Sequence, residues 1–239
     1  PTTSTTIVLA GPLSGGSPAS NFQMADTNVS GNHNDVLVLA NGSNTFQGTV
    51  TAYRGYLGFT SDAALGNAAN RVAVNVGNAN GGLRFAAEGI TLPATRSIDL
   101  FGQEVIDTQG FTGRIDGPLG STTGVGGLTK RGTGTLVIAG SASYQGPTTI
   151  ESGTLVVSGL LASTGTTTVR QGTLQLANAA ALAAGKLVAV AGGTVSLAPA
   201  LQATVGGLSP NAGGLVDVGN GMMTVASGLP VADMLVALT

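Results

Sequence analysis

Apolar and polar residues alternate in short runs along the second half of the chain, and these runs recur at a nearly constant distance. Each run begins with a glycine and then places apolar residues at every second position. Alternation with a period of two is typical of a strand that buries one face. The leading glycines are Gly134, Gly153, Gly172, Gly193 and Gly214, with successive spacings of 19, 19, 21 and 21.

A repeat of about 20 residues has room for three short strands and three bends, at about 3.3 Å per extended residue. We therefore predict an all-β fold, a parallel β-helix (β-solenoid) with about 19–21 residues and three strands in each coil. Glycine at the start of each strand fits a bend in which a Cβ atom would clash. At this repeat length, the 239 residues would form roughly 12 coils.

A second repeated segment supports the solenoid. Residues 148–151, with the sequence Thr-Thr-Ile-Glu, recur one repeat later as Thr-Thr-Val-Arg at 167–170. Parallel stacking would bring Glu151 beside Arg170, about 4.8 Å away, as an exposed pair of opposite charge between coils. A second face of each coil is therefore visible in the sequence.

The first half of the chain repeats the same elements with longer segments between them. Residues 55–59 match 172–176, and in both places an Ala-Ala-Leu tripeptide follows. We predict one β-solenoid over 1–239, with irregular coils and longer loops over 1–120 and regular repeat coils over 121–239. The glycine-rich stretch 117–127 is interpreted as an internal corner of this solenoid rather than a domain boundary.

Residues 126–157 read GGLTKRGTGTLVIAGSASYQGPTTIESGTLVV, and this segment resembles the autotransporter-associated β-strand repeat, also called the passenger-associated transport repeat. Looser similarity extends over 36–59 and 164–197. The resemblance implies a right-handed parallel β-helix in a bacterial protein that is secreted or displayed on the cell surface. Two origins remain open, the passenger of an autotransporter or a large secreted protein that carries the same repeats without a translocator.

Composition removes several functional classes. The chain has 9 Lys and Arg residues against 11 Asp and Glu, too few basic residues for the dense positive stripe of a nucleic-acid-binding protein. One histidine and no cysteine leave little for metal binding or thiol catalysis. No apolar run is long enough to cross a bilayer, so we expect no membrane insertion of this segment.

Candidate catalytic groups are equally sparse. The single histidine, His33, lies in a polar run without a nucleophile motif near it. Asp99, Asp107 and Asp116 each follow an isoleucine, and their spacings of 8 and 9 are less than half a coil, so they should lie on successive sides of one coil. Two of these carboxylates in one groove beside Arg96 or Arg114 would indicate a carbohydrate-active enzyme. We expect instead that they cap turns, and that the chain has no catalytic, cofactor-binding or metal-binding residues.

Surface recognition is the remaining chemistry that the sequence suggests. Tyr53 and Tyr56 are candidates for stacking on a glycan, whereas Phe59 should point inward. The two ends of the chain are apolar or β-prone and offer a candidate end-to-end interface. Its residues are Ile7, Val8, Leu9, Val231, Leu235, Val236 and Leu238.

Three functions follow in order of preference. The first is a secreted or cell-surface structural protein, a β-helical stalk, a matrix element or a filament subunit that self-associates end to end. The second is an adhesin that binds a glycan or a cell-surface protein through the irregular region. The third is a carbohydrate-active enzyme.

Overall fold

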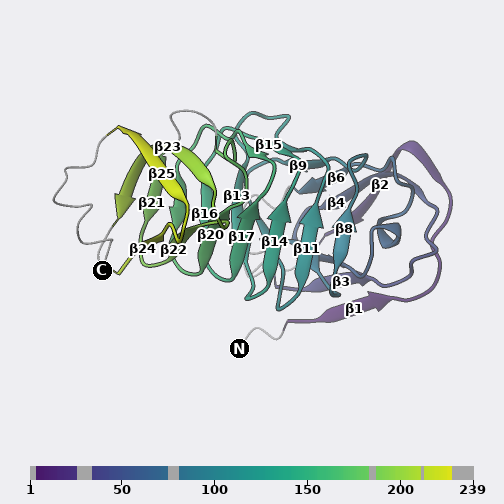
Figure 1. Ribbon diagram of the computed structural model, residues 1–239. Coiled ribbons are helices and arrows are strands. Elements are labelled where there is room, and N and C mark those ends of the chain that lie inside the picture. The colour runs from purple at the N-terminus through teal and green to yellow at the C-terminus, as the bar shows by residue number, and fades with distance from the viewer. Residues whose placement is uncertain (1–3, 26–33, 75–80, 183–186, 211–212, 228–239) are drawn as a thin grey trace.

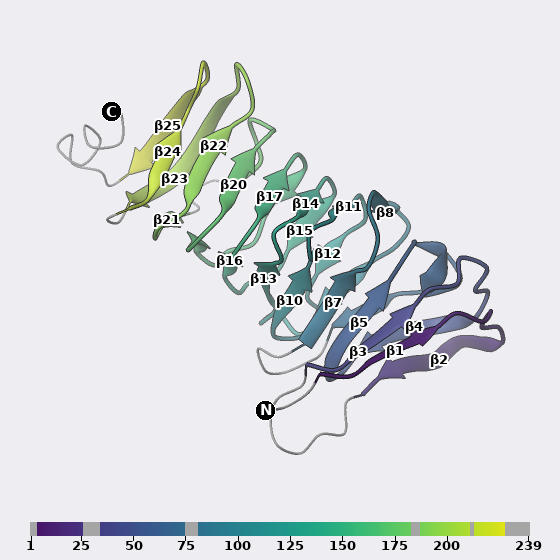
Figure 2. The same ribbon diagram turned by 90° about the horizontal axis from the view of Figure 1, so that it is seen from below.

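The protein is an elongated stack of parallel β-strands wound into a solenoid (Figure 1). The computed structural model describes residues 4–25, 34–74, 81–182, 187–210 and 213–227. The described strands form three sheets of eleven, seven and seven strands, here called sheets A, B and C. Figure 2 shows the strands of neighbouring coils side by side along the stack. The predicted all-β parallel solenoid with three strands per coil is confirmed.

Sheet A runs the whole length of the described stack. Its strands are β1 (Thr6–Leu9), β3 (Val36–Leu39), β5 (Gly55–Phe59), β7 (Gly81–Phe85), β10 (Gln103–Asp107), β13 (Gly127–Arg131), β16 (Thr148–Ile150), β19 (Thr167–Val169), β21 (Leu187–Val190), β23 (Gln202–Pro210) and β25 (Met222–Ser227).

Sheets B and C are shorter and overlap only in the middle of the stack. Sheet B contains β2 (Gly16–Met24), β4 (Gln47–Ala52), β6 (Val72–Val74), β9 (Ile98–Leu100), β12 (Leu119–Gly120), β15 (Ser141–Ser143) and β18 (Leu160–Leu161). Sheet C contains β8 (Ile90–Leu92), β11 (Thr112–Ile115), β14 (Thr135–Ile138), β17 (Thr154–Val157), β20 (Thr173–Leu176), β22 (Thr194–Leu197) and β24 (Leu215–Asp217). From β7 onward the chain passes through A, C and B in turn, so complete three-strand coils extend from β7 to β18.

The five alternating runs all become strands of sheet C, stacked in the predicted order. Leu136 faces Leu155, which faces Leu174, and each is fully buried. Within each strand, the residues that alternate with the buried ones are half-buried, so each strand has one inner and one outer face. Stacking the same position of successive coils therefore builds continuous apolar columns inside the solenoid.

Coil length differs between the two parts of the chain. In sheet A, Thr6 pairs with Val36 of the next coil, whereas Thr148 pairs with Thr167. The first of these coils is therefore about half as long again as the second. The sequence predicted roughly 12 coils, whereas the longest sheet of the described residues has eleven strands. The longer N-terminal coils explain the difference, because each uses more residues.

The equivalence drawn between residues 55–59 and 172–176 places the first segment on the wrong face of the coil. Residues 55–59 form β5 of sheet A, whereas 173–176 form β20 of sheet C. Alternation reports which side chains point inward, but every face of a coil has the same alternation. The inward position of Phe59 is still confirmed, because its side chain is fully buried and packs on Phe85 with ring centroids 4.9 Å apart.

Glycines at the strand entrances are required by close backbone approach. At Gly153 the backbone has φ +66°, and an added Cβ atom would lie 2.3 Å from the carbonyl oxygen of Gly134 in the previous coil. Gly172 repeats this arrangement, with a Cβ position 2.2 Å from the carbonyl oxygen of Gly153. Any other residue at these corners would be strained and would push neighbouring coils apart.

Candidate functional site

The three carboxylates considered for catalysis do not converge. Asp99 lies on β9 of sheet B, Asp107 ends β10 of sheet A, and Asp116 follows β11 of sheet C. Each contacts a different arginine. Asp99 contacts Arg71 at 3.2 Å, Asp107 contacts Arg84 at 3.0 Å, and Asp116 contacts Arg114 at 2.6 Å. They lie on successive sides of the coil, as the spacing predicted, and do not form the carboxylate pair of a glycosidase.

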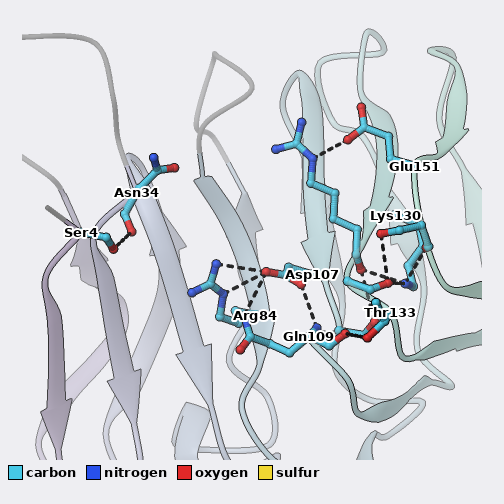
Figure 3. A network of polar contacts seen from close by, with 12 residues as sticks. Ser4, Asn34, Arg84, Asp107, Gln109, Lys130, Thr133 and Glu151 are labelled. Atoms are coloured by element: carbon cyan, nitrogen blue, oxygen red, sulfur yellow. Dashed lines mark hydrogen bonds and ion pairs between the residues drawn. The ribbon is translucent and has the colours of Figure 1, made fainter. Parts of the chain in front are cut away.

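Charged side chains of alternating sign form a column on the outer face of sheet A. Its residues are Arg84, Asp107, Arg131, Glu151 and Arg170, one for each coil. Asp107 accepts hydrogen bonds from the Nε of Arg84 at 3.0 Å and from the backbone N–H of Gln109 at 2.8 Å (Figure 3). The second of these bonds closes the turn after the strand, which is the capping role expected for Asp107.

The partner predicted for Glu151 is wrong. Its carboxylate contacts Arg131 of the preceding coil, with Nε and Oε2 2.6 Å apart, and not Arg170 of the following coil. Hydrogen bonding to Glu151 and to Tyr56 raises the pKa of Arg131 against the opposing effect of burial. The sequence places one arginine a coil before Glu151 and another a coil after it, and only side-chain packing selects between them.

Lys130 is buried inside the coil, at a position occupied by Ile106 and Ile150 in the neighbouring coils. Its ammonium donates hydrogen bonds to the carbonyl oxygens of Arg131, Gly132 and Ser152, at 2.8, 2.8 and 3.2 Å (Figure 3). Burial lowers its pKa to about 8, and the negative charge of Asp107 opposes this shift. The side chain ties the corner between sheets A and C together, a role that its position among polar residues in the sequence did not reveal.

Arg96 also has a structural role that sequence reasoning missed. Its side chain is fully buried and forms an ion pair with Asp62. It also donates to the carbonyl oxygens of Asn67 at 3.2 Å and Asn70 at 3.0 Å. The loop that it holds contains η1 (Ala63–Leu65), a single helical turn. The guanidinium thus replaces strand pairing where the N-terminal coils are irregular.

The two candidate glycan-stacking tyrosines have different environments. Tyr56 is only 5% exposed, because it packs with Val36 and Val105 on the outer face of sheet A under the guanidinium of Arg84, 4.1 Å from the ring centroid. The expectation that Tyr56 contacts a glycan is therefore wrong. Tyr53, by contrast, is 40% exposed and lies on the outer face of sheet B.

An open groove of about 480 Å³ lies beside Tyr53. It crosses the N-terminal strands of sheet B, and its polar lining includes the side chains of Asn21, Gln23 and Arg71. Phe101 lines it on the side of Tyr53. A second open groove, of about 670 Å³, lies at the corner between sheets A and C beside Asp107, Arg131 and Glu151.

The predicted end-to-end residues are only partly within the described chain. Ile7 and Val8 of β1 are 57% and 55% exposed, whereas Leu9 packs against the core. Among the described strands, β1 pairs with β3 alone. The residues Val231, Leu235, Val236 and Leu238 lie outside the described residues, as does His33.

Residues 128–157 and 162–176 match the family model of the passenger-associated-transport-repeat. Over these residues the chain matches the repeat that its sequence resembles. The first matched segment runs from β13 to β17 and the second covers β19 and β20, so the repeat corresponds to stacked coils of the solenoid. The first matched segment also contains Lys130 and the corner between sheets A and C that its ammonium holds. Comparisons with curated proteins and with solved structures found no match.

Two further observations concern the described residues. None of their helices is long and apolar enough to span a membrane. Within the same ranges, no three histidine, aspartate or glutamate side chains lie close enough together to hold a metal ion.

Proposed function

We propose that this chain is a structural element of a secreted or surface-displayed bacterial protein, in which the β-solenoid serves as a stalk or matrix element. The observation that carries this proposal is the unbroken parallel register of sheet A through eleven strands. Every coil is hydrogen-bonded to its neighbours along the stack, so the solenoid resists bending and holds its ends apart.

The use of charged residues supports the same function. Lys130 and Arg96 are fully buried and bind backbone carbonyl groups at corners and loops. Asp107 and Glu151 pair with arginines on the outer face of the sheet. These charges stabilise the stack, and the match to passenger-associated transport repeats supports a location outside the cell.

Location and shape test this proposal together. Antibodies raised against the chain should label intact, unpermeabilised cells of the source organism or their secreted material, and tomography should show the label on projecting rods or a fibrous layer. Eleven strands at about 4.8 Å spacing correspond to roughly 50 Å of stalk for the described stack. Label confined to the cell interior would contradict the proposal.

A filament built by end-to-end stacking is a second candidate, favoured by the exposed apolar residues of β1. Ile7 and Val8 lie on a strand edge that can pair with a coil from another molecule. Sedimentation velocity of the chain should then show concentration-dependent assembly that Ile7→Lys prevents. Val125→Lys is the matched control, since Val125 is 65% exposed and lies away from β1. A strictly monomeric chain at high concentration would contradict the filament.

A further inference from the structure

The groove on sheet B is formed by the outer faces of strands from successive coils. Thr51 faces Ala73 in the next coil, and Ala73 faces Asp99 in the coil after it. The small side chain of Ala73, only 4% exposed, leaves a depression between larger neighbours. The groove therefore runs along the stack, across β2, β4, β6 and β9.

One wall of the groove presents polar groups that are already held in place. The hydroxyl of Thr51 donates to Oδ1 of Asn21 at 2.7 Å, and the amide of Asn21 reaches Oε1 of Gln23 at 3.4 Å. These bonds orient the two amides before any ligand arrives, which reduces the entropy that binding would cost.

Arg71 is the one charged side chain among the residues that line the groove. Its Nη1 contacts Oδ2 of Asp99 at 3.2 Å, and Asp99 is itself fixed by the hydroxyl and backbone N–H of Thr122, both at 2.7 Å. The Arg71 side chain is nevertheless 44% exposed, against 6% for Asp99. Asp99 thus orients the guanidinium of Arg71, which lines the groove with its remaining N–H donors.

Two aromatic side chains line the opposite wall. Ala52, Val74 and Leu100 face one another in successive coils, and Tyr53 and Phe101 follow the first and the last of them. The backbone positions that carry the two rings are therefore two strand spacings apart, about 10 Å along the stack. Arg54 lies over the ring of Tyr53, with its guanidinium carbon 5.5 Å from the centroid. Tyr53 is 40% exposed, so part of its side chain is available for contact.

We propose that this groove binds an acidic oligosaccharide that lies along the stack. The guanidinium of Arg71 suits a sugar carboxylate, because its planar N–H donors match two carboxylate oxygens. The amides of Asn21 and Gln23 suit sugar hydroxyls, which both donate and accept hydrogen bonds. Tyr53 and Phe101 suit the weakly positive C–H faces of two sugar rings, since the faces of aromatic rings are negative. This binding goes beyond the stalk function and does not depend on it.

Binding of defined sugars to the full chain tests the proposal by calorimetry. The acidic probes are tetragalacturonate, a uronate polymer fragment, and 3′-sialyllactose, a sialylated host-type glycan. The neutral probes are cellotetraose and lactose. At least one acidic probe should bind more tightly than its neutral counterpart, and added salt should weaken it. Which acidic probe binds distinguishes a uronate from a sialylated source.

Matched variants locate the binding to the groove. Arg71→Ala and Tyr53→Ala should each weaken binding of the acidic probe about tenfold or more. Arg114→Ala is the control for charge, because Arg114 is 45% exposed and pairs with Asp116 on sheet C. Leu160→Ala is the control for apolar surface, since Leu160 is 38% exposed elsewhere on sheet B. Both controls should bind like the unaltered chain.

Three results would overturn the proposal. The first is that neither acidic probe binds, and the second is that the neutral probes bind as tightly as the acidic ones. The third is that Arg71→Ala and Tyr53→Ala bind as well as the two controls. Far-UV circular dichroism of all four variants should match that of the unaltered chain, because each replaced side chain is substantially exposed.

Discussion

Replacing Lys130 with methionine removes a buried ammonium and keeps its apolar stem in the interior column. Three carbonyl oxygens, those of Arg131, Gly132 and Ser152, then lose a charged donor. The Arg131 carbonyl keeps bonds from Thr108, and the Gly132 carbonyl keeps one from the Ser152 hydroxyl, so only the Ser152 carbonyl loses its partner. Each hydrogen bond to a charged group contributes about 1.5–3 kcal/mol, and all three such bonds are lost. The variant no longer buries a charge, and this offsets up to about 3 kcal/mol of the loss in stability. That figure corresponds to the lowering of the pKa of Lys130 from 10.5 to about 8. We expect Lys130→Met to lower the free energy of unfolding by about 3 kcal/mol at pH 7.

The pH dependence of this difference isolates the lysine. Because the folded pKa lies below the unfolded one, the unfolded chain binds more protons between pH 8 and pH 10.5, and stability rises with pH in that window. The rise amounts to about 2 kcal/mol between pH 7 and pH 9.5, and less if solvent reaches the amine. The methionine variant lacks this gain, so the difference between the two proteins should widen by about that amount.

Urea denaturation followed by circular dichroism at half-unit steps from pH 7 to pH 9.5 measures the difference. The series stops there because burial also raises the pKa of Tyr144, which makes the folded state lose stability above pH 10. Asp107→Asn gives an internal check. Without the nearby carboxylate the pKa of Lys130 falls further, so the rise should begin at lower pH. Parallel pH profiles for the unaltered chain and Lys130→Met would refute the reasoning.

Two further substitutions test the corners and loops. Arg96→Met should destabilise by about 3–5 kcal/mol in thermal unfolding, because it leaves the Asp62 carboxylate and the carbonyls of Gly66 and Asn70 without their donor. The exposed Arg114→Met should cost about 1 kcal/mol or less. Gly153→Ala should destabilise by more than about 2 kcal/mol, because the added Cβ meets backbone oxygen at 2.3 Å. Gly89→Ala has a similar φ of +70° but open space around it, so an equal loss in both would show that strain alone matters.

Much of the solenoid could be predicted from the sequence because its coils repeat. Equivalent positions, such as Leu136 and Leu155, recur at a constant spacing and occupy the same place in successive coils, so the spacing itself defines the stacking. The three aspartates could likewise be assigned to different sides, since their spacings are less than half of one coil. Local periodicity carries this information without any knowledge of side-chain packing.

The face assigned to residues 55–59 and the partner of Glu151 could not be predicted in the same way. Strands on all faces of a coil share one alternation, so pattern alone does not distinguish sheet A from sheet C. Arg131 and Arg170 stand one coil to either side of Glu151, and the local sequence favours neither. Tyr53 and Tyr56 differ in the same respect, because only Tyr56 is covered by Arg84 from a neighbouring coil.

The sequence by itself determined the fold class, the coil length in the regular region and the inward-facing columns, because these depend on the strand alternation and on the constant spacing of the repeats. Only the tertiary structure decided which charged groups are buried at corners and which exposed side chains gather into the groove of sheet B. Those outcomes depend on residues that are more than a coil apart in the chain and close together in space. Arg96 and Asp62 form an ion pair in this way, and Tyr53 and Phe101 line one groove. The distance between such residues along the chain varies with loop length, so they cannot be predicted from a fixed spacing in the sequence.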